Sequence, residues 1–347
     1  MPSPSGLVDL RSDTVTTPTD AMRRAMADAD VGDDGYGEDP TVNRLQELAA
    51  EMTGKDAALY VPSGTMANQL ALRVLARRGT EVLCGERAHV YRYELAAAAG
   101  NAGVQLRALP DADGLLHARD VERALEDRAH HLPPVSVVAI ENTHMPACGR
   151  PWTRVDVAAI ATIARSGGLA LHCDGARVFN ASVALGERVV SLVEPAETVM
   201  FCLSKGLGAP VGSVLCGPAA VIAQAVAERK RLGGAMRQAG VSAAAGVVAL
   251  TSMVERLADD HRRARSVAGA LAQRWPGCVD PDAVRTNVVC CDATRLPATL
   301  LGRLRAEGVL AGTIDARTVR FMTHKDVDDG DVRRVVDALD VIAKESS

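Results

Sequence analysis

An acid and a lysine each follow an apolar segment that is typical of a buried strand. Asp174 ends the first segment, with Gly175 and Arg177 behind it, and Lys205 follows the second segment and precedes a loop with three glycines. Ligands of open α/β sheets bind outside the carboxyl ends of the strands, so we expect both side chains in one crevice. Little water reaches a lysine held there, which favours the neutral amine that forms Schiff bases. Lys205 is therefore the best candidate nucleophile of the chain.

The segment from Pro62 to Asn68 offers a site for a phosphate group. It follows a predicted strand and opens a predicted helix, with small residues, hydroxyl groups and backbone N–H donors. Such a helix start attracts anions. The chain has no G-K-[ST] phosphate loop, and the glycines after Lys205 lack the spacing of a dinucleotide-binding loop. A lysine, an aspartate and an anion site are together what pyridoxal phosphate (PLP) requires of a protein.

Alternating strands and helices must position these residues. Short apolar runs alternate with helical stretches between about residues 55 and 230. Most of the runs are unbroken, which is typical of a mostly parallel central sheet covered by helices on both faces, and the fold class is therefore α/β. The predicted strands are 57–61, 81–84, 104–109, 135–141, 169–173, 199–203 and 213–216, and the predicted helices include 64–77, 118–127 and 155–166.

The length of 347 residues suggests about two domains. We expect a large cofactor-binding domain over residues 1–245, which includes the N-terminal segment, and a smaller C-terminal α+β domain over residues 246–347. A long alanine-rich helical run is expected to lead through Leu257.

The composition excludes several classes of protein. The net charge is −4 and only 3% of the residues are aromatic, which argues against a nucleic-acid-binding surface. The eight cysteines form no C-x-x-C pair, and residues 1–12 contain no apolar signal stretch. We therefore expect a cytoplasmic protein with reduced thiols and no membrane span. The acidic run between residues 33 and 39 is interpreted as a helix-capping loop, and no metal site is predicted.

Seven segments, in order, resemble the low-specificity L-threonine aldolases, which belong to the fold type I (aspartate aminotransferase) superfamily of PLP enzymes. The segments are 9–16, 32–42, 63–68, 141–144, 174–177, 203–212 and 236–238. The resemblance implies a PLP-dependent transferase-like large domain. It also implies a lyase that cleaves L-threonine, L-allo-threonine and related β-hydroxy-α-amino acids to glycine and an aldehyde. A PLP-dependent β-eliminating lyase or aminotransferase of the same fold remains the alternative, because it uses the same lysine and aspartate.

The resemblance assigns the cofactor-binding residues. It implies that Lys205 holds PLP as a Schiff base, that Asp174 pairs with the pyridine nitrogen, and that Gly64 and Thr65 hold the phosphate. Arg237 is expected to reach towards the phosphate from a neighbouring subunit. The implied assembly is a homodimer or homotetramer with shared active sites.

The resemblance also assigns residues to the substrate. His89 corresponds to a histidine that stacks on the pyridine ring, and His144 to a second histidine near the substrate hydroxyl. Either could take the hydroxyl proton, because imidazole titrates near neutral pH. Arg320 and Arg177, together with Ser12, correspond to the donors that bind the substrate carboxylate. Arg177 is also expected to contact the cofactor.

Three segments depart from the family pattern, and one further residue is expected from a neighbouring subunit. Ala96-Ala97 replaces a glycine-rich pair, Ala235 replaces the third glycine of a loop, and residues 145–148 form an atypical insert. These changes bear on substrate preference and on the selectivity at Cβ. Tyr36, like the phosphate-binding arginine, is expected to reach the site of the adjacent subunit.

Overall fold

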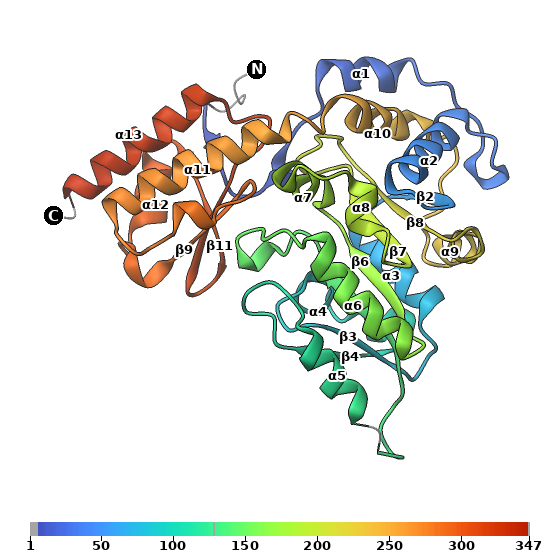
Figure 1. The fold of residues 1–347 in the computed structure, drawn as a ribbon. Helices are drawn as coiled ribbons and strands as arrows, with labels where there is room; N and C mark the ends of the chain where they lie inside the picture. The colour runs from blue at the N-terminus through green and yellow to red at the C-terminus, as the bar shows by residue number, and fades with distance from the viewer. Residues whose placement is uncertain (1–5, 128, 346–347) are drawn as a thin grey trace.

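A seven-stranded sheet forms the centre of the larger lobe in the computed structural model, which describes residues 6–127 and 129–345 (Figure 1). The strands lie in the order β2-β8-β7-β6-β5-β3-β4. β8 runs antiparallel to both of its neighbours, and every other neighbouring pair is parallel. The strands are β2 (Ala57–Val61), β3 (Glu81–Gly85), β4 (Gln105–Leu109), β5 (Val135–Glu141), β6 (Ala170–Asp174), β7 (Thr198–Cys202) and β8 (Ser213–Gly217). The predicted α/β class with a mostly parallel sheet is confirmed.

Helices cover both faces of this sheet. Successive residues of β7 point to opposite faces of the sheet. Val199 and Phe201 pack into the apolar cluster on one face, and Met200 and Cys202 pack into the cluster on the other. Unbroken apolar strands are the expected result of a sheet that is buried on both sides. The helices of this lobe are α1 (Asp20–Ala27), α2 (Pro40–Thr53), α3 (Gly64–Leu75), α4 (His89–Arg92), α5 (Ala118–Glu126), α6 (Arg154–Ser166), α7 (Val178–Leu185), α8 (Val189–Val193), α9 (Ala219–Arg231) and α10 (Gly240–Ser252).

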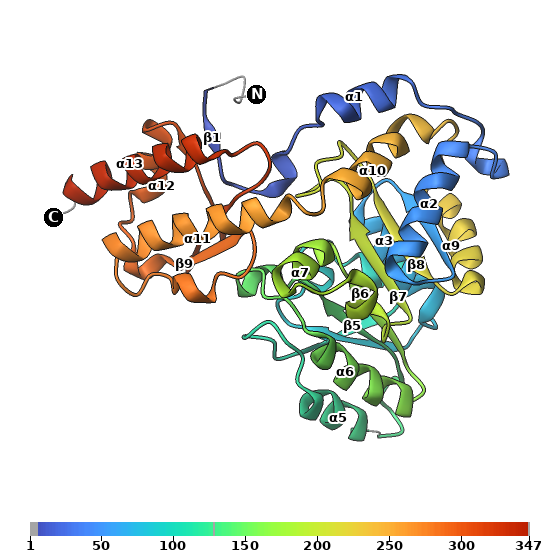
Figure 2. The ribbon, with the colours of Figure 1, turned by 45° about the horizontal axis from the view of Figure 1, so that its top comes forward.

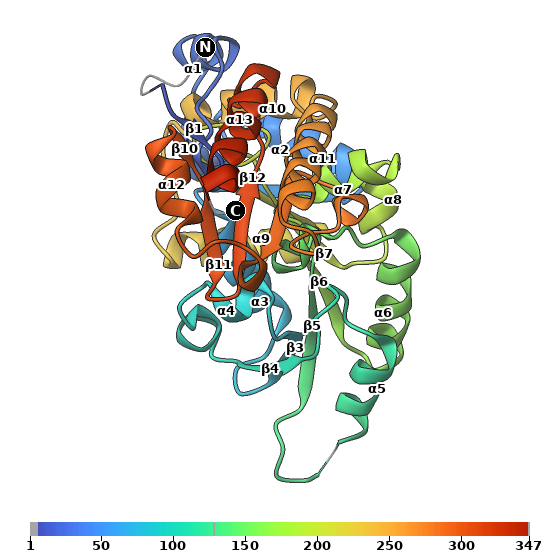
Figure 3. The same cartoon turned by 90° about the vertical axis from the view of Figure 1, so that its left-hand side faces the viewer.

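The smaller lobe contains a three-stranded antiparallel sheet in the order β11-β12-β9, with helices packed against it (Figure 3). A short strand at the start of the described chain, β1, pairs in parallel with β10 and so belongs to this lobe (Figure 2). The expected α+β character of this part of the chain is therefore present. Its elements are β1 (Val8–Asp9), α11 (Leu257–Arg274), β9 (Val288–Asp292), α12 (Leu300–Ala306), β10 (Val309–Leu310), β11 (Gly312–Asp315), β12 (Thr318–Met322) and α13 (Asp329–Glu345).

The helical run that we expected to be continuous through Leu257 is broken. α10 ends at Ser252, and α11 begins at Leu257 and is bent by 74° from it. The buried residues of α10 belong to the core of the large lobe, whereas those of α11 from Ala264 onwards belong to the core of the small lobe. Residue 245, at which we divided the chain, falls inside α10.

Two expectations from composition can be compared with the structure. All eight cysteines are free, and six of them are buried. No single helix among residues 6–127 and 129–345 is long and apolar enough to cross a membrane, although the bent pair of α10 and α11 would pass on length and composition alone. Residues 1–5, which belong to the segment considered for a signal sequence, lie outside the described residues.

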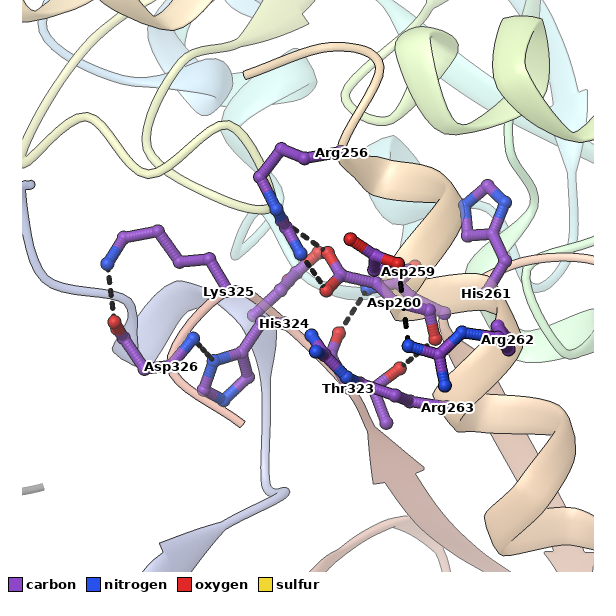
Figure 4. Close-up of polar contacts among 12 residues, drawn as sticks. Arg256, Asp259, Asp260, His261, Arg262, Arg263, Thr323, His324, Lys325 and Asp326 are labelled. Carbon is purple, nitrogen blue, oxygen red and sulfur yellow. Dashed lines mark hydrogen bonds and ion pairs between the residues drawn. The ribbon is translucent and has the colours of Figure 1, made fainter. Parts of the chain in front are cut away.

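The loop that follows β12 is joined to the start of α11 by a hydrogen bond of 2.6 Å from Thr323 Oγ1 to the Asp260 carbonyl oxygen (Figure 4). The Asp260 carboxylate is itself held by an ion pair with Arg256, at the start of the same helix. Farther along this loop, the side chain of Lys325 lies against Gly208, where an added Cβ would come within 2.9 Å of Lys325 Cδ and Cε. The small lobe therefore supports the glycine-rich loop that follows β7.

The alanine pair that departs from the family pattern includes a residue with left-handed backbone. Ala96 is exposed and has a φ of 58°, whereas Ala97 has a φ of −60°. Because Cβ disfavours the left-handed region, we expect Ala96→Gly to raise the free energy of unfolding by about 0.5–1 kcal/mol. Ala97→Gly is the matched control and should lower it by a similar amount, since glycine is unfavourable in helical backbone. Urea unfolding of both variants checks this, and equal effects of the two would contradict it.

Candidate active site

The predicted site residues follow strands whose carboxyl ends lie at one edge of the large sheet. β2 and β7 are both antiparallel to β8, and the remaining strands are parallel to β7. The carboxyl ends of these strands therefore face the same way, as required of a ligand site in such a sheet. The residues that follow them are Gly64 and Thr65 after β2, His89 after β3, His144 after β5, Asp174 at the end of β6 and Lys205 after β7.

Asp174 is the last residue of β6 and is 4% exposed. Its Oδ2 accepts a hydrogen bond of 2.7 Å from Asn68 Nδ2, and its Oδ1 accepts one from the backbone of Ala176. Burial raises the pKa of Asp174, but the nearby charges of His89 and Lys205 and the Asn68 hydrogen bond outweigh it, so the pKa lies below its ordinary value. The group is thus a buried carboxylate, suited to pair with a protonated ring nitrogen.

Lys205 lies in the loop after β7 and is half-buried. The loop is fixed through its backbone, because the Lys205 carbonyl oxygen accepts hydrogen bonds from Thr16 Oγ1 (3.0 Å) and from the amide of Gly208 (2.9 Å). The Nζ atom makes no hydrogen bond to any residue in the described part of the chain. It is therefore free to form a covalent bond while the charge of Asp174 lies close by.

The start of α3 supplies free backbone N–H groups beside β7. Ser63 caps the helix, and its Oγ accepts a hydrogen bond of 3.2 Å from the Met66 amide. The amides of Gly64 and Thr65 in the first turn have no intrahelical partner. A Cβ on Gly64 would come within 2.9 Å of Cys202 Sγ, so only glycine allows the helix to start so close to the end of β7. This geometry fits an anion site near Lys205.

A buried ion pair ties the N-terminal segment to the turn after β6. Arg177 donates two hydrogen bonds of 2.7 Å, from Nε and Nη2, to the two carboxylate oxygens of Asp13, which is 0% exposed. Burial alone raises the pKa of Asp13, but the Arg177 charge and hydrogen bonds bring it far below the ordinary value. Two of the Arg177 nitrogens are thus occupied by Asp13, and the expected contact of Arg177 with the substrate carboxylate stays a prediction. Ser12, directly before Asp13, is held at this place.

Arg320 has unused hydrogen-bonding capacity next to this ion pair. Its Nη2 donates a hydrogen bond of 2.7 Å to the Arg11 carbonyl oxygen, and its Nη1 contacts Met145 Sδ at 3.4 Å. Its Nε is buried and has no partner among the described residues. Burial and the charge of Arg177 lower the pKa of Arg320. A guanidinium with an unpaired buried N–H and no carboxylate partner in the described part of the chain is suited to bind a substrate carboxylate.

His89 is bonded to a carboxylate that the sequence analysis did not assign. The Nδ1 atom of His89 lies 3.0 Å from Glu94 Oε1, and Glu94 is 3% exposed. Glu94 also accepts hydrogen bonds from Asn68 Nδ2 (2.8 Å) and Gln69 Nε2 (2.7 Å). Glu94 and Asn68 therefore connect His89 to Asp174. Both lie within or near recognised motifs, but only their contacts reveal their roles.

His172 joins this network through Asn68 and connects it to Thr198. Its Nε2 lies 3.0 Å from Asn68 Oδ1 and its Nδ1 lies 2.8 Å from Thr198 Oγ1. Since both Asn68 N–H groups face carboxylates, the Asn68 oxygen faces His172, so Nε2 carries the proton. His172 is therefore the neutral tautomer with its hydrogen on Nε2.

The buried neutral state of His172 predicts acid sensitivity. Burial lowers the pKa of His172 from 6.5 to about 4. Between these values only the unfolded chain gains the proton, so stability falls as the pH decreases, by about 2 kcal/mol from pH 7.5 to pH 5. Urea unfolding at both pH values should show that His172→Gln loses less stability than the wild type over this interval. An equal loss in both proteins would contradict this result.

His144 is buried and is paired with Asp111. Its Nε2 lies 2.8 Å from Asp111 Oδ2, and its Nδ1 is buried without a partner among the described residues. No hydrogen bond or ion pair joins it to Lys205, Asp174 or His89 in that part of the chain. The structure thus brings His89, but not His144, into the polar network around Asp174.

Tyr36 and Arg237 lie outside this network in the chain. Tyr36 is 79% exposed, and Arg237 is exposed and forms an ion pair of 3.4 Å with Asp33. Neither contacts the groups that surround Lys205 in residues 6–127 and 129–345. The acidic run between residues 33 and 39, which we interpreted as a helix-capping loop, includes Asp39, whose side chain caps α2.

Comparisons with known proteins agree with this architecture. Residues 9–294 match the family model described as beta-eliminating lyase. Low-specificity L-threonine aldolase 1 of Arabidopsis thaliana is 42% identical over 333 residues, which cover 94% of this chain and 93% of the relative. The solved structure of Leishmania major threonine aldolase aligns with a TM-score of 0.84 at 20% identity, over 97% of this chain and 99% of that one. A structure of SPT with PLP as internal aldimine aligns with a TM-score of 0.74 at 16% identity, over 98% of this chain and 88% of that one. The chain belongs to the beta-eliminating lyase family, among the low-specificity L-threonine aldolases.

Proposed function

We propose that the protein is a PLP-dependent aldehyde-lyase that cleaves L-threonine, L-allo-threonine and related β-hydroxy-α-amino acids to glycine and an aldehyde. The observation that carries the proposal is the Nζ of Lys205, which has no hydrogen-bond partner among residues 6–127 and 129–345 and lies close to the buried carboxylate of Asp174. Family membership supports both the reaction and the cofactor. When bound, PLP supplies a ring that accepts the electron pair left by the broken Cα–Cβ bond.

The residues of the chain have distinct roles in this proposal. Lys205 holds the cofactor covalently as a Schiff base, and Asp174 keeps the ring nitrogen protonated. The amides of Gly64 and Thr65 bind the phosphate, and His89 stacks on the ring. These roles fit the free amides at the start of α3, the free Nζ and the buried carboxylate.

Arg320 orients the substrate through its carboxylate, with Ser12 and the remaining nitrogen of Arg177 beside it. Arg320→Ala should raise the KM of the substrate by about tenfold to a hundredfold, as expected for the loss of a charged hydrogen bond. kcat should fall much less. Steady-state kinetics on the PLP-loaded protein measure both. An unchanged KM would place the carboxylate site elsewhere.

The product pattern tests the reaction. PLP-loaded protein should release equal amounts of glycine and acetaldehyde from L-threonine or L-allo-threonine. Ammonia and a keto acid without acetaldehyde would identify the β-eliminating alternative, which the same lysine and aspartate permit. The ratio of the rates for the two substrates gives the selectivity at Cβ.

We further propose a cytoplasmic homodimer or homotetramer with shared active sites. Tyr36 and Arg237 then reach the site of a neighbouring subunit, with Arg237 directed to the phosphate. Their exposure in the single chain supports this arrangement. Sedimentation equilibrium measures the assembly. Activity restored on mixing Arg237→Ala with Lys205→Ala protein would demonstrate the sharing, because mixed assemblies then contain one intact site.

A further inference from the structure

We propose that Glu94 is a positioning residue that holds His89 as an imidazolium, so that His89 offers an N–H donor to the pocket and the substrate hydroxyl gives its proton to another group. This inference rests on the proposed function. It starts from the placement of three charged side chains. The ligand atoms of His89, Glu94 and Asp174 all lie within 4.8 Å of one another.

The Glu94 carboxylate has its place fixed by three donors. Oε1 faces His89 Nδ1 and Asn68 Nδ2, at 3.0 and 2.8 Å, and Oε2 accepts from Gln69 Nε2 at 2.7 Å. Since Oε1 is an acceptor, Nδ1 of His89 carries a hydrogen. The side chain of Glu94 is fully buried, so water does not screen its charge from the imidazole.

His89 faces two carboxylates and one ammonium group. Burial opposes its positive charge, but the Glu94 hydrogen bond and the charges of Asp174 and Glu94 outweigh both burial and the repulsion from Lys205, so its pKa is raised. The Glu141 carboxylate accepts the backbone N–H of His89 at 2.7 Å, and the Tyr93 ring lies 5.6 Å away. The Nε2 atom has no partner among the described residues.

A metal ion is a poor occupant of this cluster. Asn68 Nδ2 donates hydrogen bonds to both Glu94 Oε1 and Asp174 Oδ2, so N–H groups point at the oxygens that a cation would need. Lys205 supplies one positive charge near the carboxylates of Glu94 and Asp174. A positive charge on His89 supplies the second, so that the two negative charges are balanced. An imidazolium has no lone pair to take a proton, and it therefore acts as a donor.

Glu94→Gln removes the charge and retains the shape. The side-chain oxygen of the introduced amide can still accept from His89 and Asn68. Gln69, whose Oε1 is buried without a partner among the described residues, can turn its own amide to accept from the new NH₂ group. Glu94→Asp keeps the charge on a shorter side chain. Glu81→Gln is the matched control, because Glu81 is also a buried carboxylate, at the start of β3.

The test follows the His89 ring by NMR in the apoprotein with isotope-labelled histidine, assigned with His89→Gln. The His89 titration midpoint should move to lower pH by about one unit in Glu94→Gln, stay unchanged in Glu81→Gln, and return most of the way in Glu94→Asp. An unchanged midpoint in Glu94→Gln would overturn the proposal. The apoprotein readout does not depend on the reaction, so failure of the proposed function would appear separately, as absent aldehyde production.

The pH profile of the PLP-loaded enzyme separates a donor from a base. If the imidazolium is required, activity declines as the pH rises through the His89 midpoint, and Glu94→Gln shifts this decline to lower pH. At pH 8 the variant should therefore retain a smaller fraction of its maximal kcat/KM than the wild type. A shift of the acidic limb instead, with greater relative activity at pH 6, would show that neutral His89 is the base and would overturn the proposal.

Discussion

Replacement of Lys205 with alanine is expected to abolish both turnover and covalent attachment of PLP. The Nζ atom of Lys205 is the amine that the loop after β7 presents beside Asp174, without a competing hydrogen bond to the described residues. Alanine keeps the backbone contacts of the loop to Thr16 and Gly208, so the fold should persist. The loss should exceed the 10² to 10⁴-fold effect of removing a general acid or base, because no covalent catalysis remains.

Borohydride reduction followed by mass spectrometry measures the covalent attachment directly. The wild type should carry one PLP group on the peptide that contains Lys205, and Lys205→Ala should carry none. Lys230→Ala, which removes an exposed lysine of α9, is the control and should behave as the wild type. A PLP adduct on another lysine of Lys205→Ala, together with normal activity, would refute the assignment.

Replacement of Asp13 with alanine should destabilise the protein by about 3–5 kcal/mol. The substitution leaves Arg177, which is 8% exposed, as a buried charge without its partner. The pKa of Asp13 is lower in the folded than in the unfolded chain. Its contribution to the free energy of unfolding is therefore complete at pH values above the ordinary aspartate pKa and is lost as the pH falls towards the pKa of the folded state.

Urea unfolding at neutral pH checks this prediction. Glu47→Ala is the control, since it removes the partner of an exposed arginine, Arg44, and should cost less than about 1 kcal/mol. The double variant Asp13→Ala with Arg177→Met should recover much of the loss, because no unpaired charge then remains. Equal effects of the Asp13 and Glu47 substitutions would show that the buried ion pair contributes little to the free energy of unfolding.

The sequence predicts the parts of the site that follow apolar strands. Asp174 and Lys205 are found in this way, because an unbroken apolar run that ends in a polar residue marks both the strand and the edge at which ligands bind. The helix start at Gly64 is found for a similar reason. These signals are local, and each end of the seven strands predicted from them lies within one residue of the observed end.

The rest of the site depends on contacts between distant segments. The Asp13–Arg177 pair joins residues 164 positions apart, and Asn68 lies 106 positions from Asp174. Nothing in the residues around Glu94 shows that its carboxylate faces two other elements. The break between α10 and α11 was also missed, since the alanine-rich sequence favours helix on both sides of it.

The pairing of β1 with β10 has a consequence for how the chain assembles during synthesis. Val8 pairs with Val309, so β1 cannot pair with β10 until nearly the whole polypeptide has been synthesised. Contacts this distant in sequence close slowly, whereas the large lobe contains its own sheet and core. Arg11 and Asp13 lie two and four residues after β1, where the Arg11 carbonyl oxygen accepts a hydrogen bond from Arg320 and Asp13 pairs with Arg177. The contact between Arg11 and Arg320 forms only when the two ends of the chain meet. A nascent chain therefore gains the contact between its N-terminal segment and Arg320 last, after the sheet and core of the large lobe have formed.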